Sequence, residues 1–124
     1  CIATDHAPHG EEEKQGGMVG APFGIVGIET AFQLMYSNFV LGGVFTLKQL
    51  VDWMTVKPAA LFGMESGTLD IGSQADIAIF ELENEYEIRS EDFLSKATNT
   101  PFTGWKVKGE TLYTLVDGKV VYTK

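Results

Sequence analysis

The chain has 124 residues, of which 44% are hydrophobic, and a formal net charge of −8 at pH 7. This length suits one small domain. The acidic balance argues against nucleic acid and anionic membrane surfaces as partners, because both are bound mainly through Lys and Arg. No apolar run is long enough to span a bilayer, and the single cysteine excludes an internal disulfide and favours the cytoplasm.

The N-terminal residues are typical of a strand that leads into a long loop. Residues 1–5 are predicted to be the end of a buried strand, as if a longer chain had been entered midway. Residues 6–24 are rich in glycine and proline, so we expect an irregular loop. A loop of this length in a compact domain is often functional.

A helix is predicted over residues 25–40, followed by two shorter ones. The first has apolar residues recurring at spacings of three and four, namely Ile28, Phe32, Met35 and Phe39. Thr46 begins the second helix, because Gln49 completes a capping-box pattern with it. Pro58 suits the first turn of a third helix, and Gly63 suits its end.

After Gly63 the pattern changes to strands. Residues 76–82, 111–116 and 119–122 are predicted strands, and a short helix is expected near residues 90–94. Asp117-Gly118 between the last two strands is a strong hairpin signal.

We therefore divide the chain near Gly63. Residues 1–63 are expected to hold a barrel-type strand, its active-site loop and the helices. Residues 64–124 are expected to form part of a small β domain.

Polar residues cluster immediately after the predicted first strand. An Asp at the carboxyl end of a parallel strand is where barrel enzymes keep catalytic groups. Asp5 could bind a metal or accept a proton, and His9 could donate a hydrogen bond to an anionic substrate. Pro8 disfavours a helical pairing of His6 with His9. The alternative remains open that Asp5 caps a loop and the histidines lie on the surface, because three polar residues do not define a site.

A second cluster, Ala21-Pro22-Phe23-Gly24, precedes the predicted helix. Backbone N–H groups at a helix N-terminus bind anions, and a glycine lets a ligand approach the backbone closely. The alternative is an ordinary entry from loop to helix.

These motifs resemble those of dihydroorotases, in the amidohydrolase superfamily. Residues 3–9, followed after four residues by Lys14, resemble the second dihydroorotase signature, and residues 21–30 are similar to the loop and helix after the last barrel strand. Other segments resemble the wider superfamily or the C-terminal motif of the family: residues 57–63, 67–69, Gly72, 75–76 and 99–104.

The resemblance implies an α/β fold class, with the C-terminal portion of a (β/α)8 TIM-barrel amidohydrolase and part of a small β-sandwich domain. It implies a zinc-dependent enzyme that interconverts N-carbamoyl-L-aspartate and L-dihydroorotate in de novo pyrimidine biosynthesis. Asp5 would bind zinc and act as the catalytic acid and base. His9 would contact the small-molecule substrate, and Phe23 and Gly24 would offer backbone contacts. A structural hydrogen bond is expected for His6.

The chain departs from the family in its metal ligands. The family also uses a His-x-His pair, further histidines and often a carboxylated lysine, whereas this chain has only His6 and His9. A catalytic zinc takes about three protein ligands. We therefore expect an incomplete zinc site, a fragment that is inactive and unstable alone, and association as a homo-oligomer or through exposed barrel faces.

Three alternatives stay open. In the first, the longer protein that contains this chain is another cyclic amidohydrolase, such as a hydantoinase, a dihydropyrimidinase or an allantoinase. In the second, it is a catalytically silent dihydroorotase-like subunit with a structural role. In the third, the chain is a free-standing small binding domain.

Overall fold

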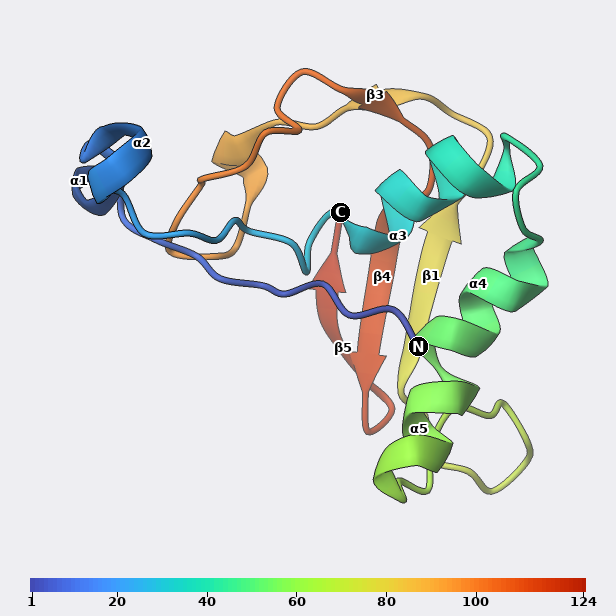
Figure 1. Cartoon of the computed structure of the whole chain (residues 1–124). Coiled ribbons are helices and arrows are strands. Elements are labelled where there is room, and N and C mark those ends of the chain that lie inside the picture. Colours follow the sequence, from blue (N-terminus) through green and yellow to red (C-terminus); the bar gives the residue numbers. More distant parts are fainter.

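The computed structural model describes all residues from 1 to 124. Helices lie along one side of a small antiparallel sheet, and two single-turn helices project at the far end of the molecule (Figure 1). The helical segments are α1 (Glu11–Lys14), α2 (Gly17–Gly20), α3 (Ala31–Met35), the π-helix η1 (Tyr36–Val40), α4 (Leu47–Met54), α5 (Val56–Phe62) and the 3-10 turn η2 (Ser90–Asp92). The strands are β1 (Ile77–Glu81), β2 (Tyr86–Glu87), β3 (Lys106–Val107), β4 (Glu110–Val116) and β5 (Lys119–Thr123).

The main sheet confirms the predicted strands. Its order is β1-β4-β5, with both pairs antiparallel, while β2 and β3 form a separate two-stranded ribbon. Asp117 and Gly118 both have positive φ, 51° and 74°, as a two-residue turn with the right-handed twist of the strands requires. The ribbon was not predicted, because two-residue strands carry no periodic pattern.

The predicted helix over residues 25–40 is wrong before Ala31, and its predicted apolar face is confirmed at Phe32 and Met35 but not at Ile28 and Phe39. The helix begins at Ala31. The Ile25 carbonyl, which would accept within a helix from residue 25, instead accepts from Ala7 N–H at 2.9 Å. A π-turn then follows, in which Leu41 N–H donates to the Tyr36 carbonyl. The buried pair is consequently Phe32 and Tyr36, and Ile28 is 62% exposed.

The N-terminal segment also differs from the prediction. Residues 1–5 form no strand, and the extended backbone meets a neighbour at one isolated parallel bridge between His6 and Ile25. The expected loop over residues 6–24 contains the single helical turns α1 and α2. Their short polar and glycine-rich sequences have no periodic pattern from which a helix could be predicted.

The predicted second and third helices are confirmed. Thr46 Oγ1 accepts from Gln49 N–H at 3.2 Å, and Gln49 Oε1 accepts from Thr46 N–H at 2.8 Å. Gly63 ends α5 in the left-handed conformation, with φ of 65°.

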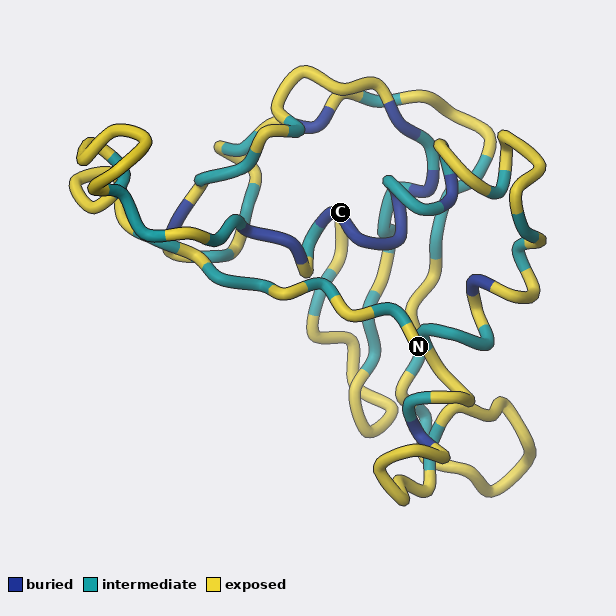
Figure 2. The backbone as a smooth tube through the Cα atoms, viewed as in Figure 1, coloured by how far each residue is buried: buried dark blue, intermediate teal, exposed yellow.

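A small aromatic core joins the helices to the sheet. The Phe32 ring stacks on Phe80 of β1 with centroids 3.8 Å apart, and Tyr36 and Leu50 complete the cluster. Truncating a buried Phe to Ala costs about 3–5 kcal/mol, which makes this contact a major link between α3 and the sheet. Only 13 of the 124 residues are buried; Figure 2 shows α1 and α2 almost wholly exposed, whereas α3 is buried or half-buried. None of the helices combines the length and apolar character needed to cross a membrane.

We predict that Thr46→Ala destabilises α4 by about 1 kcal/mol, because the mutant loses the side chain that caps its first turn. Amide hydrogen exchange over residues 47–54 of the protein measures this local opening. Thr46→Ser, which keeps the hydroxyl, serves as the matched control and should exchange close to the wild-type rate. Equal exchange in the Ala and Ser variants would contradict the capping role.

Candidate active site

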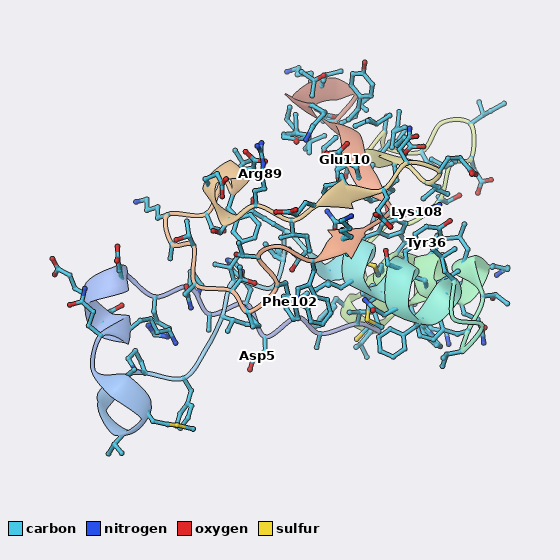
Figure 3. The ribbon with its side chains drawn as sticks, turned by 90° about the horizontal axis from the view of Figure 1, so that it is seen from above. Asp5, Tyr36, Arg89, Phe102, Lys108 and Glu110 are labelled. Carbon is cyan, nitrogen blue, oxygen red and sulfur yellow. The ribbon has the colours of Figure 1, made fainter.

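Asp5 has a strained backbone at the end of the extended N-terminal segment. Its φ of 48° is in the left-handed region, which non-glycine residues seldom adopt outside turns. The side chain is exposed, and it lies on the opposite side of the molecule from Arg89 and Glu110 (Figure 3). Strain of this kind is often found where a functional group has to be held in one direction.

Two glycines allow the segment after Asp5 to lie against residues 24–28. Gly24 has φ of 124°, and a Cβ there would come within 2.5 Å of the Ala7 Cβ. A Cβ on Gly27 would come within 2.8 Å of the Thr4 carbonyl oxygen. The bridge is closed by Ala7 N–H, which donates to the Ile25 carbonyl at 2.9 Å. Gly24 therefore has a packing reason to be glycine, independent of any ligand.

His9 is held by both ring nitrogens and by its backbone. Nε2 lies 2.9 Å from the Phe23 carbonyl oxygen, to which it must donate, and Nδ1 lies 3.4 Å from Glu13 Oε2. The backbone N–H donates to Asn99 Oδ1 at 3.0 Å. Both ring nitrogens therefore face oxygen atoms of the protein.

The Pro22–Gly24 turn is fixed through its carbonyl groups. Lys14 Nζ donates to the Pro22 oxygen at 2.6 Å and to the Gly24 oxygen at 2.7 Å. Asn99 Nδ2 also donates to the Gly24 oxygen, at 2.9 Å. The N–H groups of Phe23 and Gly24 donate to no protein acceptor, and the Phe23 side chain is 95% exposed.

Lys14 and Asn99 are the residues whose contribution sequence reasoning missed. Both lay in motifs that the sequence analysis singled out, but no role was predicted for either side chain. The spacing of Lys14 from the Pro22–Gly24 turn gives no sign that a single helical turn, α1, brings them together. Asn99 is distant in sequence from His9, and only the fold places it between the two loops.

His6 has the structural hydrogen bonds expected of it. Its Nδ1 accepts from the N–H groups of Gly27 at 3.2 Å and Ile28 at 3.3 Å. The neutral ring then carries its proton on Nε2, which is a hydrogen-bond donor rather than a metal ligand.

The donor set fits a zinc ion at Asp5 alone. Asp5 offers an exposed carboxylate, a suitable zinc ligand. The rings of His6 and His9 are engaged by backbone groups and by Glu13. No group of three or more His, Cys, Asp or Glu side chains in the chain is arranged to hold a metal.

Glu29 ties the site to the C-terminal half. Its carboxylate accepts from Leu94 N–H at 2.7 Å and from Ser95 N–H at 3.0 Å. Burial raises the pKa of Glu29, but hydrogen bonds from Ser95 and Leu94 outweigh this effect and bring the pKa below its ordinary value.

The sequence model of the amidohydrolase family matches residues 1–121. The chain belongs to the amidohydrolase family. It is similar to the dihydroorotase of Enterococcus faecalis, with 62% identity over 124 residues. It is also similar to the dihydroorotase of Geobacillus thermodenitrificans, with 56% identity over 123 residues. The matches include 100% and 99% of this chain, respectively, but only 29% of the length of each relative.

Solved amidohydrolase structures share this fold. The L-hydantoinase of Arthrobacter aurescens is 38% identical, with a TM-score of 0.88 over 97% of this chain and 28% of its own. The dihydropyrimidinase of Brevibacillus agri is 32% identical, with a TM-score of 0.88 over 96% of this chain and 27% of its own. These matches confirm the predicted fold class, a mixed α/β portion of a TIM-barrel amidohydrolase.

We predict that Gly24→Ala opens the bridge between the two segments, because the new methyl group meets Ala7 and the backbone must adopt a strained φ. The amide of Ala7 should exchange about tenfold faster or more. Gly20→Ala is the matched control, because nothing lies within 4 Å of a Cβ there and its φ is outside the left-handed region. If the two variants exchange alike at Ala7, the packing role of Gly24 is refuted.

The lowered pKa of Glu29 predicts a pH-dependent attachment of residues 94–95. The folded state favours the carboxylate, so this stabilisation is present above the ordinary pKa of 4.5 and is lost as the pH falls through the lower folded value. Exchange of the Leu94 and Ser95 amides, corrected for the intrinsic effect of pH, should accelerate only in this acid range. Glu29→Gln should remove the transition, and its persistence in that variant would assign it to another group.

Proposed function

We propose that this chain is the part of a zinc-dependent dihydroorotase that carries one zinc ligand and a portion of the substrate pocket. The enzyme interconverts N-carbamoyl-L-aspartate and L-dihydroorotate. The observation that carries the proposal is 62% identity to a dihydroorotase along the whole chain, including the segment that ends at the strained Asp5. The chain spans 29% of that relative's length, so the other ligands belong to residues outside it.

Asp5 is proposed as both zinc ligand and proton carrier. When bound, zinc supplies a Lewis acid that polarises the amide carbonyl and lowers the pKa of water. The Asp5 carboxylate accepts the proton of the attacking water and returns it to the leaving ring nitrogen. In the direction of synthesis the same group takes a proton from the carbamoyl nitrogen.

The substrate carboxylate is proposed to bind where His9 and the Phe23-Gly24 turn meet. Each unpaired N–H of Phe23 and Gly24 can donate to a substrate oxygen. The His9 ring lies beside this turn, where a substrate oxygen would compete with the Phe23 carbonyl for its Nε2–H. Local donors of this kind allow a chain with a net charge of −8 to hold an acidic substrate.

A second candidate is hydrolysis of another cyclic amide. The structural neighbours named hydantoinase or dihydropyrimidinase have TM-scores of 0.86 to 0.90 at 29–38% identity. The difference between these identities and those of the dihydroorotases favours dihydroorotate as the substrate. The rates at which the longer protein that carries this segment turns over dihydroorotate, hydantoin and allantoin discriminate between the candidates.

The context of the enzyme is part of the same proposal. We place it in the cytoplasm and in pyrimidine biosynthesis, with residues 1–63 in the barrel and residues 64–124 in the small β domain. Association as a homo-oligomer, or through exposed barrel faces, is part of the proposal. Exposed apolar residues of α5 and the segment after it are available for such contacts: Val56, Leu61, Phe62, Met64, Leu69 and Ile71.

The deciding experiment compares Asp5→Asn with Asp117→Asn in the longer protein that carries this segment. Asp117 also has positive φ and lies in the β4–β5 turn, so the two changes are matched in chemistry and backbone. Dihydroorotate turnover should fall about 100- to 10,000-fold in Asp5→Asn and remain at the wild-type level in Asp117→Asn. Bound zinc, measured in parallel, should also fall in Asp5→Asn. Wild-type turnover in Asp5→Asn would refute its role, and a zinc-bound wild-type protein without any turnover would favour the silent structural subunit.

A further inference from the structure

The Pro22–Gly24 turn owes its geometry to a side chain that touches none of the proposed reacting atoms. Lys14 Nζ makes two short hydrogen bonds, to the Pro22 and Gly24 carbonyl oxygens. An ammonium group bonded to carbonyls forms charge-assisted hydrogen bonds, which are stronger than neutral ones. Lys14 is also partly buried, which reduces screening of these bonds by solvent.

We propose that Lys14 is a positioning residue that aims the backbone N–H groups of the turn at the substrate. This inference rests on the proposed function. In a trans peptide the C=O and the following N–H point in opposite directions, and the chain has no cis peptide bond. The bond from Lys14 to the Pro22 oxygen therefore fixes the plane that carries the Phe23 N–H and turns that N–H away from the ammonium group.

His9 and Asn99 set the neighbouring parts of the same turn. The His9 ring holds the Phe23 oxygen, and so fixes the plane that carries the Gly24 N–H. Asn99 donates to the Gly24 oxygen and accepts from the His9 backbone, so it joins the turn to the loop after Asp5. The N–H groups of Phe23 and Gly24 have no protein acceptor, so both remain free to donate to a ligand.

Lys14 is placed for this by α1. The single turn Glu11–Lys14 sends Glu13 toward His9 Nδ1 and Lys14 toward the Pro22–Gly24 turn. The Glu13 carboxylate also accepts from Gly10 N–H at 3.0 Å, which anchors the start of this turn. One four-residue helix thus supports both halves of the proposed pocket wall.

The test is Lys14→Met in the longer protein, with Lys14→Arg and Lys48→Met as comparisons. Met keeps the length of the side chain and removes its donors, whereas Arg keeps donors. Lys48 is an exposed residue of α4 that pairs with Asp52. Lys48→Met therefore removes the same charge as Lys14→Met, but outside the Pro22–Gly24 turn. In Lys14→Met the KM for dihydroorotate should rise about tenfold or more, because N–H groups misplaced by about 1 Å bind poorly. Zinc content should not change, Lys14→Arg should recover part of the loss, and Lys48→Met should match the wild type.

Two results would overturn the positioning role: a KM in Lys14→Met equal to that of the wild type, or loss of zinc and thermal stability in the same proportion as turnover. Hydrogen exchange over residues 20–27 separates this inference from the proposed function. If the wild-type protein does not turn over dihydroorotate, the proposed function fails, and the exchange still decides about Lys14. Faster exchange in Lys14→Met than in Lys48→Met supports the clamp, and equal exchange refutes it.

Discussion

The close parallel approach of residues 4–9 to residues 24–28 is the constraint on which the candidate site depends. It requires a glycine at position 24, because a side chain there would overlap Ala7. One backbone bridge and the His6 ring then hold the two segments together. Everything proposed for catalysis follows from this contact, since it places the loop after Asp5 beside the turn that carries the Phe23 and Gly24 amides.

The C-terminal half of the chain contributes to the site without lining it. Asn99 bridges the two site segments, and Glu29 bonds to the backbone of residues 94–95 on the way from the site to α3. The Phe32–Phe80 stack continues the connection to the main sheet. The parts before and after Gly63 therefore pack against each other even though the chain is divided there. Substitutions in residues 64–124 are expected to affect the site through these contacts.

Patterns with a local physical cause were predicted correctly. The Thr46–Gln49 cap, the stop at Gly63 and the turn at Asp117-Gly118 each depend on a few neighbouring residues, and all three are confirmed. The helix predicted from residue 25 failed in its first part because the Ile25 carbonyl accepts from Ala7, a residue far from it in sequence, instead of from within the helix. The π-turn at Tyr36 then shifted the apolar face, which a regular helical period does not describe.

The sequence by itself determined the family and the strands of the sheet, and its resemblance to dihydroorotases made Asp5, His9, Phe23 and Gly24 the candidate site residues. A resemblance of this kind rests on residue types at fixed spacing, which is a property of the chain alone. Only the tertiary structure decided that the Asp5 backbone is strained, that His9 and Lys14 hold the carbonyls of one turn, and that Asn99 joins the two loops. Such contacts depend on the relative positions of segments distant in sequence, which local propensity and periodicity do not encode.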